Sequence, residues 1–252
     1  MTFDDVQKFS NAAAAKSMML KEHPGKYFIR SIMAGFFIAV AVIYSNVVGN
    51  LFKQDGMVAW GKLLGALVFA IAVLLIVFIG SELFTGNNFV MAFGAYSKAV
   101  TWGQAVKVWI VSYIGNFVGC FIFSGIWVLA GSSGTQEYFA GFIGGKLSIA
   151  PGEMFFRAVL CNFFVCLAVA CGTKCKEEAS KFLMIMICIS GFVISGFEHC
   201  ITNMAVFTVA GCVVPGVSIS SMLFSMLIVT LGNIVGVAVL LALPLRKMSA
   251  DK

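Results

Sequence analysis

The chain of 252 residues is 60% hydrophobic and 11% charged, and it carries a formal net charge of +6. Its mean hydropathy is +0.99. This composition excludes a soluble globular protein and indicates a chain that lies in a lipid bilayer. We therefore expect the bilayer as its surroundings and no nucleic-acid partner.

Residues 1–26 are polar, but Phe3, Val6 and Phe9 recur within them at helical spacing. This pattern predicts an amphipathic helix against the bundle or the membrane surface, with a solvated tail as the alternative. The rest of the chain consists of long uncharged runs, and a spanning helix needs about 20 apolar residues. We predict six crossings, the second and the fifth of them broken: about 28–52, 62–97, 106–131, 154–174, 181–213 and 217–244.

The Lys and Arg residues indicate the orientation in the membrane. With the N-terminus inside, 13 of the 17 lie in predicted cytoplasmic segments and four on the other side. By the positive-inside rule, this bias predicts a multi-pass protein of the plasma (inner) membrane with both termini in the cytoplasm.

A set of small motifs occurs twice. Gly80-x-Glu82-x-x-x-x-Asn87 returns 116 positions later as Gly196-x-Glu198-x-x-x-x-Asn203. Asn46 and Asn162 are also 116 apart, and Gly115-Asn116-x-x-Gly119 is echoed at 117 by Gly232-Asn233-x-x-Gly236. Three matches in register predict a duplicated fold.

The duplication predicts an all-α membrane protein of six transmembrane helices in two repeats. Three crossings in each half make the second half inverted relative to the first. We therefore assign one transmembrane channel domain over 1–252, with a cytoplasmic N-terminal helix over 1–26, a first repeat over 27–131 and an inverted repeat over 146–245.

Both glutamates interrupt runs that are too long for one span and too short for two. Glycines and asparagines at these points predict helix breaks. We expect one loop over 81–86 with a half-helix from Asn87, and another break over 196–202 with a restart near Asn203. Glu82 and Glu198 are either ligands for a cation or, as we favour, acceptors for loose backbone N–H groups.

His199 lies on the second break, where a titratable group is hard to explain by packing, so we assign it a functional role. The eight cysteines show no disulfide or zinc spacing and are interpreted as small packing residues. The sequence predicts no metal, no cofactor and no catalytic residue.

The strings at the two breaks resemble the signature loops of the formate/nitrite transporter family. They are Gly80-Ser-Glu-Leu-Phe-Thr-Gly86 and Phe197-Glu-His-Cys-Ile-Thr-Asn-Met204, and Leu160-Cys-Asn-Phe-Phe-Val-Cys166 is similar too. The resemblance covers essentially the whole chain. It implies an aquaporin-like protomer, a homopentamer with one pore per protomer, and passage of small monovalent anions, often together with a proton.

The resemblance also implies roles for individual residues. Thr85 and His199 match the central threonine and histidine, Lys146 the vestibule lysine, Asn162 a pore-lining asparagine, and Lys16 a lysine of the cytoplasmic side. The constrictions map to Phe69, Leu83, Phe84 and Phe192, although phenylalanines at such positions can equally be ordinary core residues. Glu82, Glu198, Asn87 and Asn203 would structure the loops.

We therefore predict formate passage, coupled to protons through the central histidine. Alternatives within the family are hydrosulfide, nitrite or lactate. A remote alternative is a rhomboid-like intramembrane serine protease, because the chain has a Gly131-Ser132-Ser133-Gly134 string and an intramembrane histidine. A neutral-solute channel of the aquaporin kind is a further alternative, but its Asn-Pro-Ala caps are absent, since Asn87 and Asn203 precede Asn and Met.

Overall fold

The structure is a computed structural model that describes residues 1–249, except for the side chain of Ser133. All its regular elements are helical, which confirms the predicted class. The first half contains α1 (Phe3–Glu22), α2 (Pro24–Gln54), α3 (Val58–Phe69), α4 (Ile71–Ile79), α5 (Phe84–Tyr96) and α6 (Trp102–Leu129). The second contains the 3₁₀ turn η1 (Ser132–Gly134), α7 (Gln136–Leu147), α8 (Pro151–Lys174), α9 (Glu178–Ile194), α10 (Cys200–Val213), α11 (Ile219–Val237), the π-helix η2 (Ala238–Ala242) and α12 (Leu243–Lys247).

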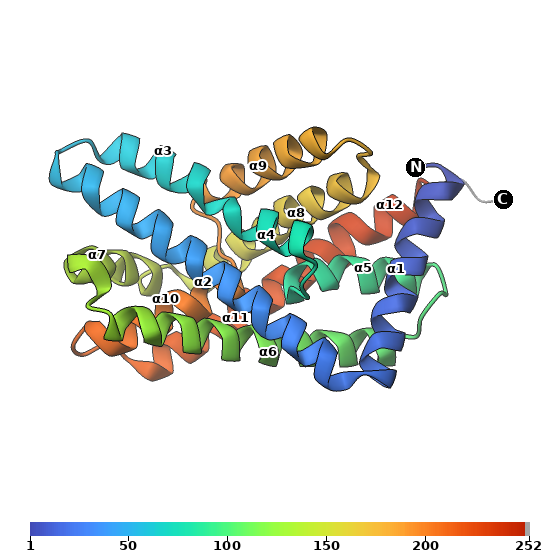
Figure 1. The fold of residues 1–252 in the computed structure, drawn as a ribbon, viewed down its shortest axis with the longest axis horizontal. Coiled ribbons are helices and arrows are strands. Elements are labelled where there is room, and N and C mark those ends of the chain that lie inside the picture. The colour runs from blue at the N-terminus through green and yellow to red at the C-terminus, as the bar shows by residue number, and fades with distance from the viewer. Residues whose placement is uncertain (250–252) are drawn as a thin grey trace.

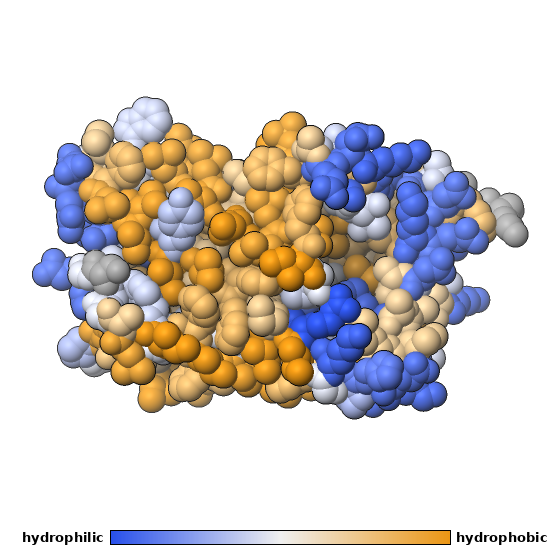
Figure 2. Space-filling view, in the orientation of Figure 1, coloured by the Kyte–Doolittle hydropathy of each residue, from blue (hydrophilic) through white to orange (hydrophobic). Residues whose placement is uncertain are grey.

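The long helices run along the longest axis of the molecule, and α1 crosses them at one end (Figure 1). The α2–α3 connection and α7 lie at the opposite end. Hydrophobic residues gather over the middle of the surface, and hydrophilic residues mainly at the two ends (Figure 2). This is the distribution expected of a multi-pass membrane protein.

Within the described part of the chain, five helical segments are long and apolar enough to cross a membrane. They are Pro24–Gln54, Val58–Ile79, Trp102–Leu129, Pro151–Lys174 and Ile219–Lys247. The other predicted crossing corresponds to α9 followed by α10. At 17 residues, α9 rises about 26 Å, short of a hydrocarbon core of about 30 Å.

Two helix pairs pack at backbone distance because glycines face the partner helix. A Cβ on Gly119 of α6 would overlap the carbonyl oxygen of Ile32 in α2. A Cβ on Gly236 of α11 would in the same way overlap the carbonyl oxygen of Val159 in α8. The Gly-Asn-x-x-Gly motif therefore specifies close contacts of α2 with α6 and of α8 with α11.

The chain leaves the helical conformation at both predicted positions. Gly80 (φ 83°) ends α4, and Gly196 (φ 71°) follows α9, both with the positive φ that glycine adopts without strain. The helices resume at Phe84 and Cys200, three residues before the expected restarts at Asn87 and Asn203.

The early restarts have a cause on other helices. Asn116 Oδ1 of α6 accepts a hydrogen bond from Phe84 N (2.9 Å), and Asn233 Oδ1 of α11 accepts one from Cys200 N (2.9 Å). Each short helix is thus capped at its first residue by a side chain distant in sequence. In α10 the N-cap residue His199 adds a cap of its own, because its side chain accepts from Thr202 N.

The match of Asn46 with Asn162 is not a structural equivalence. Asn46 Nδ2 donates to Val42 O of its own helix, whereas Asn162 Nδ2 donates to Asn233 O of another. The residues of α2 and α8 that make equivalent contacts are Arg30 and Arg157, 127 positions apart (157 − 30). Each donates a hydrogen bond to the carbonyl of the glycine at its own break.

Helix α7 was not predicted, because its segment lies between the third and fourth predicted crossings, 106–131 and 154–174. Phe139 and Ile143 lie one turn apart on α7 and are buried. Phe139 packs on Trp127 with ring centroids 5.6 Å apart. Helix α7 therefore closes one end of the bundle, beside the cavity described next.

Candidate functional site

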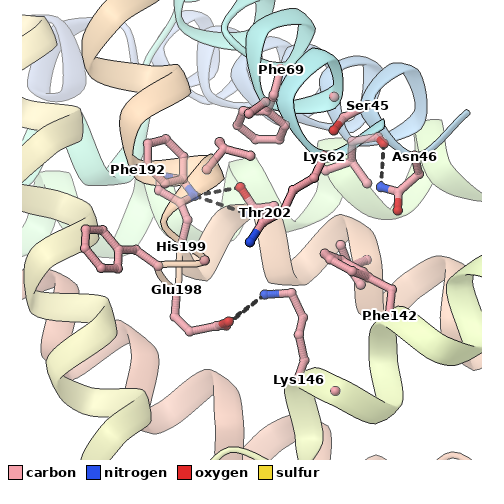
Figure 3. Close-up of a pocket in the computed structure, with 18 of the residues that line it drawn as sticks. Ser45, Asn46, Lys62, Phe69, Phe142, Lys146, Phe192, Glu198, His199 and Thr202 are labelled. Carbon is pink, nitrogen blue, oxygen red and sulfur yellow. Dashed lines mark hydrogen bonds and ion pairs between the residues drawn. The ribbon is translucent and has the colours of Figure 1, made fainter. Parts of the chain in front are cut away.

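A cavity of about 410 Å³ opens at the end of the bundle that carries α7. Phe69, Phe192, His199 and Thr202 line its inner part, while Lys62, Lys146 and Glu198 extend into it from three directions (Figure 3). The cavity thus brings together residues from α3, α7, α9 and the start of α10. Of the predicted site residues, it collects Lys146, Glu198, His199, Phe69 and Phe192.

His199 is the N-cap residue of α10 and is 3% exposed. Its Nδ1 accepts a hydrogen bond from Thr202 N (3.1 Å), so Nδ1 carries no proton. In the neutral imidazole the proton is therefore on Nε2, which donates to Thr85 Oγ1 at 3.0 Å. A ring protonated on both nitrogens would lose the bond from Thr202 N, although Thr202 Oγ1, 3.1 Å from Nδ1, would then be in place to accept. With Thr202 N donating to Nδ1, the neutral ring directs its donor at Thr85.

The Thr85–His199 contact joins the beginnings of two helices. Thr85 is the second residue of α5, and His199 immediately precedes α10. The N-terminus of a helix carries partial positive charge and favours an anion. Both short helices therefore direct their positive ends at one buried point.

Aromatic rings surround the approach to this point. Phe69 and Phe192 meet edge to face with ring centroids 5.9 Å apart, and Phe192 stacks on His199 at the same separation. Leu83 and Phe84, predicted to be part of the constriction, are buried but do not line this cavity. Phe84 packs on Tyr113 instead, at 4.9 Å.

Glu198 is paired rather than free. Lys146 Nζ lies 2.8 and 2.9 Å from its two carboxylate oxygens, and Asn203 Nδ2 donates to it at 2.9 Å. The charge of Lys146 is therefore offset within hydrogen-bond distance.

Glu82 has the same kind of environment at the other break. Lys16 Nζ of α1 donates to Glu82 Oε2 at 2.6 Å, and Tyr27 Oη donates to it at 3.2 Å. Asn87 Nδ2 in turn donates to Tyr27 Oη at 2.9 Å. Lys16, Glu82 and Asn87 thus form a cluster separate from the cavity.

Both carboxylates accept from side chains rather than from the loose backbone N–H groups we expected them to bind. The backbone at the breaks has other partners. Asn116 Nδ2 donates to Glu82 O (3.0 Å), and Asn233 Nδ2 donates to Glu198 O (2.9 Å). Arg30 and Arg157 donate to the carbonyls of the break glycines, Gly80 O and Gly196 O.

Asn162 lies next to Thr85 and is not among the residues that line the cavity. Its Nδ2 is 3.5 Å from Thr85 O and 3.4 Å from Asn88 Oδ1. Cys166, one turn later on α8, donates from Sγ to Thr85 O at 3.2 Å. Asn162 and Cys166 therefore hold the first turn of α5 in place.

Sequence reasoning missed several residues of this site. Arg30 and Arg157 were used only to orient the chain, and Asn116 and Asn233 were noted only as a repeated motif. That repetition was the available signal, because a doubled asparagine inside apolar helices needs buried partners. Lys62 carries no local signal, and Thr202 lies within the quoted string Phe197–Met204 but was given no role of its own. Within residues 1–249, no group of three or more His, Cys, Asp and Glu side chains could hold a metal ion.

Residues 4–246 match the family model described as formate/nitrite transporter. The chain belongs to the formate/nitrite transporter family. The nitrite transporter NirC of Escherichia coli (strain K12) is 30% identical over 248 residues, which cover 96% of this chain and 91% of the relative.

Two solved structures are similar at 26% identity. One, titled "FNT family ion channel", has a TM-score of 0.92 and covers 98% of this chain and 99% of its own. The other, titled "Pentameric formate channel with formate bound", has a TM-score of 0.73 and covers 89% and 97%. This chain is accordingly a membrane transport protein and not an enzyme. The rhomboid-like alternative is wrong, and its Gly131–Gly134 string lies in the turn between α6 and α7.

Proposed function

We propose that this protein passes small monovalent anions, formate foremost, through a pore inside each protomer. The observation that carries the proposal is the buried Thr85–His199 hydrogen bond, where the N-termini of α5 and α10 meet at the inner end of a cavity. A neutral donor and two positive helix ends suit a small anion. The titles of the similar structures and relatives name formate and nitrite.

The fold that serves this function is two inverted repeats of three crossings, with the second and fifth crossings broken. The paired contacts at the two breaks support this organisation, because each glycine carbonyl, glutamate and first helical N–H has the same kind of partner in both halves. The counts of spans and charges support a cytoplasmic location for both termini, and we assign the protein to the plasma (inner) membrane. The domain runs over 1–252, with its repeats at 27–131 and 146–245.

The anion's route follows from the order of the side chains. It enters the cavity beside Lys146, passes the Phe69–Phe192 pair, and reaches the donor on His199 and the hydroxyl of Thr85. Asn162 lies beyond them, and Lys16 lies near the other break. Leu83 and Phe84 narrow the route on the far side. The aromatic rings on either side disfavour the passage of a hydrated charge. A hydrogen-bond donor between them, the role given to His199, is therefore needed to stabilise the anion.

Coupling to protons follows from the same contact. The Nε2–H of neutral His199 donates a hydrogen bond to the anion in place of Thr85. Complete transfer of that proton would require Nδ1 to take one, which breaks its bond from Thr202. The imidazole therefore acts as a hydrogen-bond donor and keeps its proton, while a proton taken up from the solution at the entry side converts the anion to the neutral acid that crosses between the aromatic rings.

A homopentamer in the lipid bilayer is the assembly we propose, because one similar structure is titled as a pentamer. Exposed apolar residues along α6 and α11, such as Phe121 (56% exposed) and Leu223 (65%), would be covered by lipid or by a neighbouring protomer.

The test is anion flux in vesicles. Purified protein is reconstituted, and uptake of formate, nitrite, hydrosulfide and lactate is followed with and without an inward proton gradient. We expect formate uptake above that of protein-free vesicles, faster with the gradient. Preference for hydrosulfide or nitrite would keep the family role and replace the substrate. Osmotic water flux without any anion flux would refute the proposal.

A further inference from the structure

The charged side chains that line the cavity differ in how far a neighbouring carboxylate offsets their charge. Its described lining contains three cations, Lys62, Lys146 and Arg157, and one carboxylate, Glu198. Lys146 is ion-paired with Glu198, and Arg157 is ion-paired with Glu153. Two of the three positive charges are therefore offset by carboxylates.

Lys62 differs from the other two cations. None of the ion pairs formed within residues 1–249 includes it. It is exposed, and its side chain extends from the first turns of α3 into the same cavity as Lys146 and His199 (Figure 3). Its charge is thus the uncompensated one in the lining.

We propose that Lys62 is the residue that draws the substrate anion into the cavity, and that Lys146 serves mainly to hold Glu198. The inference rests on the proposed anion passage. It assigns the electrostatic attraction of the anion at the opening of this cavity to one side chain. A single uncompensated charge in a concave site raises the local concentration of the opposite charge. Its influence reaches the entering anion through water, so salt screens it.

Exchange of Lys62 tests this assignment. We compare initial formate uptake of the reconstituted full-length wild type with Lys62→Gln, Lys62→Glu and Lys62→Arg at low formate concentration. The matched control is Lys53→Gln, which removes the same charge at the same end of the molecule, where Lys53 lies over the ring of Tyr138. Each variant is first checked for the oligomer size of the wild type.

Coulomb's law for unit charges roughly 8–10 Å apart gives Lys62→Gln an uptake about twofold slower in a water-like dielectric and about 15- to 30-fold slower at the lower dielectric typical of a protein surface, so we expect a loss of at least about twofold. We expect this at about 0.01 M background potassium gluconate, where the screening length is about 30 Å, and no difference at about 1 M, where it is about 3 Å. Lys62→Glu should be slower still, and Lys62→Arg and Lys53→Gln should match the wild type.

Two results would overturn the inference. One is equal low-salt uptake by Lys62→Gln and the wild type. The other is a defect that persists at high salt or appears equally in Lys53→Gln, which would indicate a structural or general surface effect. If wild-type protein itself gives no anion uptake, the proposed function fails instead, so the two failures are distinguishable.

Discussion

Asn233 offers the sharpest test of how the second break is held. Its Oδ1 accepts from Cys200 N (2.9 Å), and its Nδ2 donates to Glu198 O (2.9 Å) and Ala158 O (2.8 Å). Asn233→Leu keeps similar volume but leaves Cys200 N–H and Glu198 C=O unpaired in the interior. Each buried polar group left unpaired costs about 1–3 kcal/mol.

The two groups together give a loss of about 2–6 kcal/mol. For a chain of this size, 1 kcal/mol shifts Tm by about 2–4 °C, so Asn233→Leu should melt at least about 4 °C below the wild type. Thermal unfolding of the detergent-solubilised oligomer, followed by tryptophan fluorescence, measures the shift.

Asn233→Asp separates capping from the full set of bonds. It retains the acceptor for Cys200 N–H but loses both donors and places a negative charge beside Glu198 O. We expect it to be at least as destabilised as Asn233→Leu. The control is Ser225→Ala on the same helix, because Ser225 Oγ is buried and has no hydrogen-bond partner within residues 1–249. The reasoning is refuted if Asn233→Leu melts within about 1 °C of this control.

Two other predictions concern packing and pH. Gly236→Ala places a methyl group on the carbonyl of Val159, so it should prevent oligomer assembly or lower Tm by several degrees. The control is Gly125→Ala, which should be neutral or slightly stabilising because no atom lies within 4 Å of the added Cβ. Equal melting of the two variants would contradict the close packing. Burial raises the pKa of Asp5, but hydrogen bonds from Thr2 and Lys174 lower it by more, to below its ordinary value. The Asp5–Lys174 ion pair thus stabilises the docking of α1 above about pH 4 by at most about 1 kcal/mol and is lost as pH falls further. Hydrogen exchange of α1 should rise below that pH in the wild type but not in Asp5→Asn, and an identical pH profile for both would exclude the pair as the cause.

The features of this structure that depend on neighbouring residues could be predicted from the sequence. Membrane character, the helical class and the family are all confirmed, because apolar run lengths and the two break motifs are local signals. The helix ends at Gly80 and Gly196 were within a residue or two of prediction, since glycine marks such ends directly.

What the sequence could not predict depends on partners far along the chain. The restart at Phe84 was misplaced because Asn116, on another helix, caps it. The match of Asn46 with Asn162 was misleading because the first crossings correspond at a spacing of 127 and the breaks at 116. The first repeat is therefore longer between its first crossing and its break (80 − 30 = 50 residues against 196 − 157 = 39), and a fixed offset does not detect such a difference within a repeat. Helix α7 was not predicted because its three glycines are unfavourable in a helix. Only the one-turn spacing of Phe139 and Ile143, which are buried, indicates helical structure there.

Within the site, the resemblance identified both His199 and Thr85 as central residues, but neither their hydrogen bond nor its direction was predicted. That direction comes from Thr202 N, which occupies Nδ1. The pairing of Lys146 with Glu198 was also unforeseen, and it offsets the charge of Lys146 with a carboxylate within hydrogen-bond distance. Pathway and constriction roles for these residues stay predictions.

The measurement that bears most directly on the central claim is formate uptake by His199→Phe in proteoliposomes. Phenylalanine keeps the ring beside Phe192 but removes the donor to Thr85 and the acceptor for Thr202 N. We predict that gradient-driven uptake falls at least tenfold while oligomer size is retained. Uptake equal to that of the wild type would show that the imidazole is not needed and would contradict the account.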